Sequence, residues 1–246
     1  MTGTLLNVSA IVVGALTGAA LGGRLPERVR GSVTDVLGLF VLVLGVADAL
    51  DTFGPELADR LGRGAVLVIL GSLLVGGIVG EVVDIEARLT RVGERLRDAV
   101  MGRADRGADG EVARHRFVEG FVVTTLLVCV GPLAVLGALE DGLTAGFPLL
   151  SVKSVLDGFA ALAFASALGL GVAFAALPLL LYQGGLTLLA SGLEPWTSEA
   201  MVAAIGAVGG FLVIGIGLRL LEIRAIRVAN LLPALVVAPL VVAAWP

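Results

Sequence analysis

The feature that most constrains this chain is a succession of long apolar segments that charged residues scarcely interrupt. Of its 246 residues, 57% are hydrophobic and 15% are charged, and the mean hydropathy is +1.02. Soluble domains are about 45–50% apolar and about 25% charged, so this chain has too few charges to cover a soluble surface. The composition therefore predicts an all-α, polytopic transmembrane helix bundle, with 1–246 as a single transmembrane domain.

A helix needs about 20 mostly apolar residues to cross a bilayer core. Applied along the chain, this length predicts about eight membrane-spanning helices. We expect them at 5–23, 33–50, 64–83, 117–138, 150–170, 173–192, 199–218 and 228–245.

Arginine is distributed unevenly among the connections between these segments. Residues 24–32 carry three, 84–116 carry eight and 219–227 carry three, whereas 139–149 and 193–198 carry none. Short connections rich in basic residues stay on the cytoplasmic side of a membrane. The distribution therefore predicts that the amino terminus lies outside.

The apolar stretch 150–192 has no charged residue after Asp157 to mark a turn. If this stretch crossed once, the Arg-bearing segment 219–227 would lie outside. Two crossings, with a turn near Gly169 to Gly171, keep it inside. A re-entrant hairpin in this stretch is the main alternative.

Residues 84–116 form the one sizeable polar segment and are predicted to be a cytoplasmic amphipathic helix followed by a linker. Apolar residues recur there at helical spacing among Arg and Glu: Ile85, Leu89, Val92, Leu96 and Val100. Such a helix lies on the headgroups of anionic lipid, or it is solvated and packs its apolar stripe on neighbouring loops. Residues 101–113 have the composition of a flexible linker.

The two ends of the chain show a weak internal similarity. Gly38-Leu39-Phe40 in the second segment resembles Gly209-Gly210-Phe211 in the seventh, and each precedes an aliphatic run. On the predicted topology, the first three and last three helices run in opposite senses. This pattern indicates an inverted three-helix repeat around a central hairpin, as in many secondary transporters. Chance alignment of Gly-rich and Leu-rich helices is the alternative.

Lys153 and Asp157 introduce charge near the start of the segment 150–170. Their spacing of four places them on one helix face, where they can pair. One interpretation is a salt bridge near the interface, with Lys153 snorkelling outward. The other is a cation or substrate site at Asp157, with Ser154 beside it, that Lys153 gates or neutralises.

Gly131-Pro132 interrupts the segment 117–138 near its middle. Proline lacks a backbone N–H and clashes with the preceding turn, so it breaks the helix and frees carbonyl groups. In a membrane these carbonyls need a partner, either a neighbouring helix or a water-filled cavity.

Further polar residues in the apolar segments are candidates for binding an ion or solute. Gln183 is a ligand or a link between helices, and Asn7 and Asn230 are ligands or helix caps. The remaining candidates are Glu119, which opens the segment 117–138, together with Thr125 and Asp141. Six acidic residues predict an outer rim that attracts cations: Asp48, Asp51, Glu140, Asp141, Glu194 and Glu199.

Enzymatic chemistry finds no support in the sequence. The only histidine, His115, lies in the Arg-rich segment, and no GxSxG elbow, phosphate-binding loop, or zinc or haem spacing is present. Basic residues alternate with acids, which argues against nucleic-acid binding. We therefore expect no enzyme, no cofactor and no nucleic-acid partner.

Five stretches resemble the prokaryotic membrane family called domain of unknown function 554. They are GTLLNVSAIVVGALTG (3–18), FVEGFVVTTLLVCVGPLAVLGALEDGL (117–143), KSVLDG (153–158), LYQG (181–184) and GGFLVIGIGLRLLEIRAIRVANLLPAL (209–235). The resemblance implies a multi-pass protein of the prokaryotic inner (plasma) membrane, of a family often described as transporters, with no established substrate. It draws attention to Glu119, Asp141, Lys153, Asp157 and Gln183 without assigning them roles.

Together these features predict a transporter or channel for an ion or small solute. Its path would lie between the segments 117–138, 150–170 and 173–192. The alternative is a non-catalytic scaffold or regulator that binds lipid or a partner through 84–116. Gly-rich helices in a thin bundle are also compatible with a homodimer, which the sequence does not specify.

Overall fold

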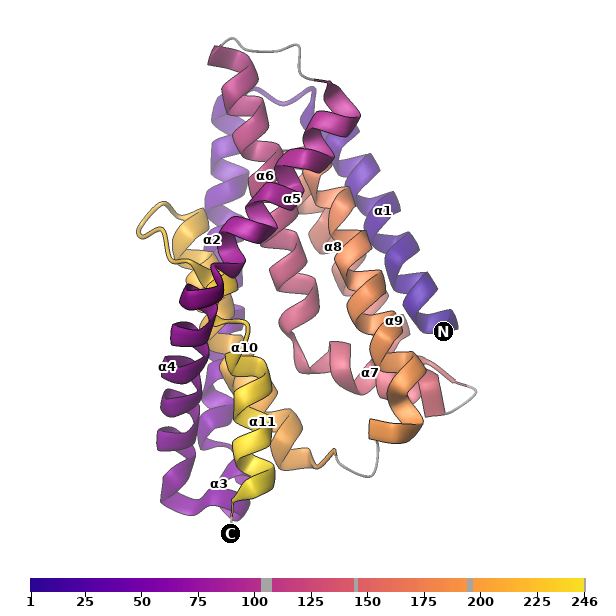
Figure 1. Ribbon diagram of the computed structural model, residues 1–246. Helices are drawn as coiled ribbons and strands as arrows, with labels where there is room; N and C mark the ends of the chain where they lie inside the picture. Colours follow the sequence, from indigo (N-terminus) through magenta and orange to yellow (C-terminus); the bar gives the residue numbers. More distant parts are fainter. Residues whose placement is uncertain (103–107, 144–145, 194–196, 246) are drawn as a thin grey trace.

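The computed structural model describes residues 1–102, 108–143, 146–193 and 197–245, and all regular elements within them are helical (Figure 1). The α-helices are α1 (Thr2–Gly22), α2 (Glu27–Ala49), α3 (Pro55–Leu61), α4 (Ala65–Val83), α5 (Ile85–Met101), α6 (Ala108–Val130), α7 (Pro132–Leu143), α8 (Pro148–Leu168), α9 (Ala176–Leu193), α10 (Glu199–Leu220) and α11 (Ala234–Ala244). Short 3-10 turns are η1 (Leu50–Phe53), η2 (Gly62–Gly64), η3 (Leu170–Ala175) and η5 (Val228–Leu231).

Five helical stretches of the described residues are long and apolar enough to cross a membrane. They are Thr2–Gly22, Glu27–Val83, Pro148–Leu168, Leu170–Leu193 and Glu199–Leu220, and the bent pair formed by α6 and α7 would make a sixth. The 57-residue stretch contains both α2 and α4, which rise from the short α3 in Figure 1. The predicted all-helical, multi-spanning fold is thus confirmed, while the number of eight crossings stays a prediction.

Helices α1 and α8 pack closely because glycines of α1 lie against the backbone of α8 along their contact. A Cβ atom at Gly14, Gly18 or Gly22 would overlap the backbone carbonyl of Gly158, Leu162 or Ser166, respectively. Both series advance by four residues in the same direction, so the two helices run parallel. Glycine is what allows two membrane helices to approach to backbone contact.

The stretch 150–192 does reverse direction at the predicted place. α8 ends at Leu168, and Gly169 follows with φ +85°, a conformation that glycine adopts without strain. η3 then leads into α9, which runs antiparallel to α1, since Thr4 meets Thr187 and Asn7 meets Gln183. Because α1 is parallel to α8, α8 and α9 are antiparallel.

The other half of the molecule contains two further antiparallel helix pairs. α2 and α10 run antiparallel, with Gly45 against Gly210 and Gly38 against Gly217. α4 lies antiparallel to the end of the chain, where Gly76 contacts Ala234 in α11 and Gly80 contacts the carbonyl of Asn230 in η5.

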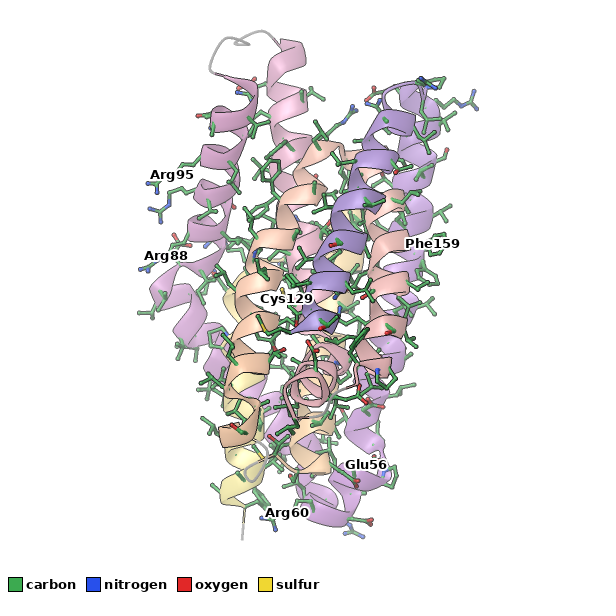
Figure 2. The ribbon with its side chains drawn as sticks, turned by 90° about the vertical axis from the view of Figure 1, so that its right-hand side faces the viewer. Glu56, Arg60, Arg88, Arg95, Cys129 and Phe159 are labelled. Atoms are coloured by element: carbon green, nitrogen blue, oxygen red, sulfur yellow. The ribbon has the colours of Figure 1, made fainter. Side chains whose placement is uncertain are left out.

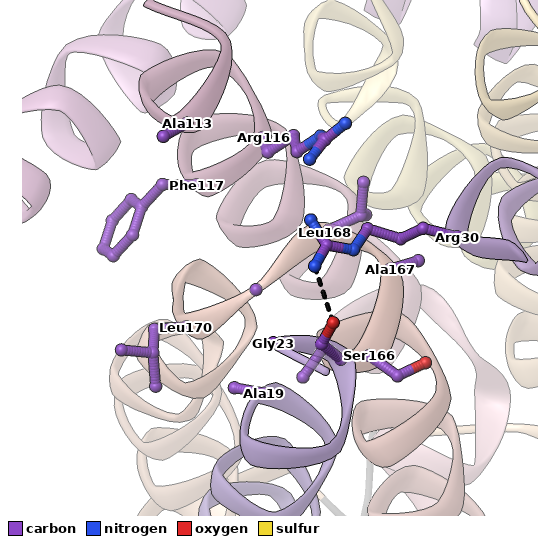
Figure 3. A pocket seen from close by; sticks show the side chains of 13 residues that line it. Ala19, Gly23, Arg30, Ala113, Arg116, Phe117, Ser166, Ala167, Leu168 and Leu170 are labelled. Carbon is purple, nitrogen blue, oxygen red and sulfur yellow. Dashed lines mark hydrogen bonds between the residues drawn. The ribbon is translucent and has the colours of Figure 1, made fainter. Parts of the chain in front are cut away.

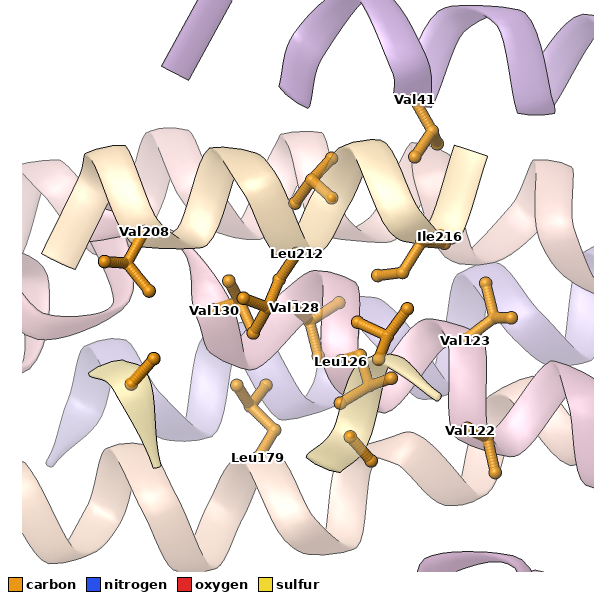
Figure 4. Close-up of a cluster of buried hydrophobic side chains, with 14 of the residues drawn as sticks. Val41, Val122, Val123, Leu126, Val128, Val130, Leu179, Val208, Leu212 and Ile216 are labelled. Atoms are coloured by element: carbon orange, nitrogen blue, oxygen red, sulfur yellow. The ribbon is translucent and has the colours of Figure 1, made fainter. Parts of the chain in front are cut away.

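α6 lies at the centre of the apolar core, between these groups of helices. Figure 4 shows its Val122, Val123, Leu126, Val128 and Val130 packed among side chains of α2, α9 and α10. The helix ends at Val130, and α7 leaves at an angle of 62° after Gly131. The predicted break is confirmed. The predicted span 117–138 thus covers parts of two helices, α6 and α7, and that this bent pair crosses the membrane stays a prediction.

α5 folds back onto the bundle instead of standing apart from it. Phe121 and Val118 of α6 lie against Gly93, and Leu89 and Leu96 are partly buried. Val92 and Val100 of the same stripe are exposed, so packing on neighbours accounts for part of the amphipathic face. Figure 2 shows Arg88 and Arg95 on the outward side of this helix.

The predicted linker 101–113 is only partly correct. α6 begins at Ala108, so 108–113 is helical, and residues 103–107 lie outside the described part of the chain.

Candidate functional site

Lys153 joins the break in α6 to the charged face of α8. Its ammonium donates a hydrogen bond of 3.0 Å to the carbonyl oxygen of Val128. In an unbroken helix that carbonyl would accept from residue 132, which is a proline without an N–H. The freed carbonyl expected from the sequence therefore has a side-chain partner, and the helix break and the lysine form one unit.

The same ammonium pairs with the carboxylate of Asp157, one turn further along α8. Lys153 is 5% exposed, and the Asp157 side chain is 13% exposed. The predicted pairing is thus confirmed. The idea that Lys153 snorkels outward is wrong, because its head is turned into the bundle toward two oxygen atoms.

Asn7 connects this pair to α9. Its side-chain nitrogen donates to Asp157 Oδ2 at 2.9 Å and to Gln183 Oε1 at 3.2 Å. Both amides are fully buried. Asn7 lies one turn inside α1, because that helix begins at Thr2, and it is therefore not a helix cap. The polar cluster formed by Asn7, Lys153, Asp157 and Gln183 thus spans three helices.

Asp141 forms a second buried group that is linked to this polar cluster. Its carboxylate accepts from the backbone nitrogens of Gly3 and Thr4, each at 3.1 Å, and from the Thr4 hydroxyl at 3.2 Å. That hydroxyl lies 3.1 Å from the hydroxyl of Thr187, whose single proton bonds either to Thr4 or to the carbonyl of Gln183. With that proton on Thr4, a hydrogen-bonded chain runs from α7 through α1 to Thr187 of α9.

Several buried polar atoms near the helix break have no hydrogen-bond partner among the described residues. They are Asn7 Oδ1, Gln183 Nε2 and the hydroxyls of Thr124 and Thr125, one turn before Val128. Unpaired buried polar atoms are costly, so each calls for water, an ion or a solute as a partner.

Other predicted residues lie apart from the polar cluster. Ser154 donates back to the carbonyl of Leu150 within its own helix. Glu119, expected to open a helix, lies well inside α6, where it is 3.5 Å from Arg219 Nε. Asn230 does not cap its own helix. Its side-chain oxygen accepts from the backbone nitrogen of Glu86 and thereby caps α5.

A network of ion pairs joins the three Arg-bearing connections at one end of the molecule. Glu27 pairs with Arg116, and Glu86 pairs with Arg219 at 2.5 Å. Beside these pairs, Arg30 and Arg116 line a hollow of about 210 Å³ between the ends of α1 and α8 (Figure 3). Arg30 donates to the carbonyl of Gly22 there and caps α1.

The opposite end contains an acidic hollow of about 450 Å³ between η1, α3, α7 and α10. Asp51, Glu56 and Glu199 line it, together with Pro132 of the helix break. Figure 2 shows Glu56 and Arg60 at this end and Cys129 near mid-height of the bundle. Two members of the predicted acidic rim, Asp51 and Glu199, therefore line one hollow, while Glu194 lies outside the described residues.

Three groups of the site were not identified by residue from the sequence. Thr4 and Thr187 link the buried groups, but threonines of membrane helices usually bond their own backbone and give no distinct signal. The Val128 carbonyl could have been found by counting four residues back from Pro132. α1 was also missing from the expected path, although it supplies Asn7.

Comparison with known proteins gives a consistent picture. A family model described as "Protein of unknown function (DUF554)" matches residues 2–243. The chain is 32% identical over 243 residues to the uncharacterized protein YqgA of Escherichia coli (strain K12), covering 99% of this chain and 97% of that one. It is 28% identical over 242 residues to the uncharacterized membrane protein YdfK of Bacillus subtilis (strain 168), covering 98% and 96%. No solved structure matches.

Proposed function

This chain belongs to the DUF554 family, whose description names no activity, and from its own geometry we propose that it is a transporter or channel for a small ion or solute. The chain is a multi-pass membrane protein. The proposal concerns what its buried polar cluster does, and it is carried by one observation: an ion pair lies beside a broken helix, among polar atoms that have no partner in the part of the chain that the structure describes.

A purely structural role accounts poorly for this arrangement. Burying a Lys–Asp pair costs more desolvation than it returns unless its geometry and hydrogen bonds are excellent. Here Asn7 Oδ1 and Gln183 Nε2 have no hydrogen-bond partner among the described residues. The neighbouring groups, Lys153 and Asp157, are hydrogen-bonded. Inside membrane proteins, irregular backbone is tolerated where it is buried in protein or lines a water-filled cavity, and charged residues commonly mark substrate or ion pathways. The arrangement therefore favours a binding site over a structural link.

The pairing of helices supports the inverted repeat that this proposal includes. In that repeat α1 corresponds to α9, α2 to α10 and α4 to α11. Each of these helices contacts its counterpart in antiparallel orientation. A twofold axis in the membrane plane requires that counterpart helices run antiparallel, and carriers built on such repeats bind substrate near the repeat interface. Asn7 and Gln183, which bond each other, lie on one such pair of helices.

The ion pairs between Arg-bearing connections support the proposed orientation. They bring 24–32, 84–116 and 219–227 to one end, which we assign to the cytoplasmic side of a prokaryotic plasma membrane. The acidic hollow then faces outward, where its carboxylates would concentrate cations. In this orientation the amino terminus lies outside, close to the polar cluster.

The proposal is tested by solute flux into vesicles that contain the purified protein. We would measure transient currents and uptake across monovalent cations, divalent cations, protons and organic anions. Wild type would be compared with the double variant Lys153→Met/Asp157→Asn, which removes both buried charges together. Flux present in wild type and absent from an equally stable double variant supports the proposal. Silence of folded wild-type protein for every solute would instead favour a scaffold role, with α5 as its binding segment.

A further inference from the structure

The ammonium of Lys153 occupies a position made of oxygen atoms. It is bonded to the carbonyl of Val128 and to the carboxylate of Asp157. Carbonyl and carboxylate oxygens are also the ligands that replace the hydration shell of a small cation in a selective pore. We propose that Lys153 is the tethered occupant of a binding site for a monovalent inorganic cation, which competes with it for these two oxygens. This inference rests on the proposed function.

The charge balance of the site selects a monovalent cation. With Lys153 in place, one positive and one negative charge cancel in a buried region. When the ammonium withdraws, Asp157 is left with one uncompensated charge, which is very costly in an apolar setting. A monovalent cation restores neutrality, whereas a divalent cation leaves one positive charge in excess. An anion would add to the negative charge of Asp157.

A further oxygen ligand lies next to this position. Asn7 donates its nitrogen to Asp157, and its own side-chain oxygen is buried without a partner among the described residues. It supplies a neutral oxygen of the kind that a desolvated alkali cation requires, and the single carboxylate supplies the charge.

The Lys153 side chain is long and flexible enough for its ammonium to leave these two oxygens and return to them. Lys153 lies in the second turn of α8, which begins at Pro148, and Asp157 lies one turn deeper. A lysine side chain is a point charge on a flexible four-carbon stem, which can swing toward the membrane surface without moving the helix. The acidic hollow is lined by Pro132 of the helix break, and its carboxylates would concentrate cations there.

The direct test is thermal unfolding of the purified full-length protein at constant ionic strength in sodium, potassium, magnesium or choline chloride. In Lys153→Met the competitor is gone. We therefore expect sodium or potassium to raise the unfolding midpoint above that in choline, increasingly with concentration, as ligand binding to the folded state requires. The half-saturating concentration should lie about tenfold or more below that of wild type, which corresponds to about 1.4 kcal/mol.

Two outcomes of this test would overturn the inference. One is an identical midpoint of Lys153→Met in sodium, potassium and choline; the other is stabilisation by magnesium alone. Lys153→Met/Asp157→Asn is the matched control and should not respond to any of the four salts, because it lacks the carboxylate.

Cys129 provides a second measurement that does not depend on the stability of Lys153→Met. It is the only cysteine of the chain and directly follows Val128. If a cation displaces Lys153 from the Val128 carbonyl, the alkylation rate of Cys129 in wild type should change saturably with sodium or potassium and not with choline. Equal rates in all three salts would overturn the inference.

Failure of this inference can be told apart from failure of the proposed function. Flux of an organic anion, of a divalent cation or of protons alone would leave the transport proposal standing and remove the monovalent-cation site. Silence of folded wild type for every solute would remove the transport proposal itself.

Discussion

The ammonium of Lys153 lies 3.0 Å from the carbonyl oxygen of Val128, the group that Pro132 leaves without a partner in its helix. Two irregularities that are each costly in a membrane thus satisfy one another: a buried charge and a freed carbonyl. The lysine in turn pairs with Asp157, and Asn7 joins the carboxylate to Gln183. The polar cluster therefore depends on the helix break as much as on its charges.

Replacing Pro132 with alanine is expected to lower flux. Residue 132 would regain an N–H, which can bond the Val128 carbonyl and take it from Lys153. Pro132 is the first residue of α7, where proline is well tolerated, so no gain in the unfolding midpoint is expected from its removal. Pro55→Ala is the control, since Pro55 also begins a helix, α3, but its N–H would take no carbonyl from Lys153. A Pro132→Ala protein with unchanged flux would separate the helix break from the activity.

The charge pair predicts a non-additive effect on stability. Asp157→Asn alone leaves Lys153 buried without its counter-charge, and breaking such a pair costs about 3–5 kcal/mol. Adding Lys153→Met to this variant should recover most of that loss, because a neutral pair needs no counter-charge. The free energies of unfolding of the wild type, both single variants and the double variant form the required cycle. Additive losses would mean that the two residues do not depend on each other.

Glycines of α1 hold the polar cluster at its spacing. Gly18→Val would place side-chain atoms on the carbonyl of Leu162 and push α1 away from α8. The hydrogen bond between Asn7 of α1 and Asp157 of α8 depends on the close approach of these two helices. We expect a loss of about 1–3 kcal/mol in the free energy of unfolding, the usual cost of overpacking, together with loss of flux. Gly71→Val in α4 is the control, because open space surrounds Gly71. Equal stability of the two variants would show that the α1–α8 contact is not tight.

The docking of α5 depends on Asn230. Its side chain accepts from the backbone nitrogen of Glu86 and donates to Glu81 at 2.9 Å. Asn230→Ala should cost about 0.5–2 kcal/mol, as for other helix caps, and should speed hydrogen exchange in α5 more than in α10. Thr17→Ala on the exposed face of α1 should leave both exchange rates unchanged. Unaltered protection of α5 in Asn230→Ala would contradict the capping role.

Much of the fold is encoded in local sequence properties. Apolar length and the positions of Arg predicted the helices and the turn at Gly169, because both follow from the bilayer as solvent. The pairing of Lys153 with Asp157 also follows from helical spacing alone. The helix break at Gly131-Pro132 was also predictable, because it follows from the missing N–H and the ring of proline.

The contacts between distant helices could not be predicted in this way. Gly14, Gly18 and Gly22 mark a close contact but do not say which helix makes it. The cap alternative for Asn7 is wrong, because α1 begins at Thr2, three residues before the expected start, and Asn7 lies inside the helix. Proline predicts the break in the helix but not the direction of α7, because that direction depends on packing against the other helices.

The most direct test of the central claim exchanges the two charges of the polar cluster. In Lys153→Asp/Asp157→Lys the salt bridge is kept, but the carboxylate moves one turn away from Asn7 and the lysine moves away from the Val128 carbonyl. Flux of the wild-type solute would be measured in vesicles that contain either protein, after their unfolding midpoints have been compared. The account predicts lost flux, because the positions of the oxygen atoms form the site, and a lower unfolding midpoint, because the Val128 carbonyl and the Asn7 amide lose their partners. Wild-type flux in the exchanged protein would contradict it and leave the pair a structural salt bridge.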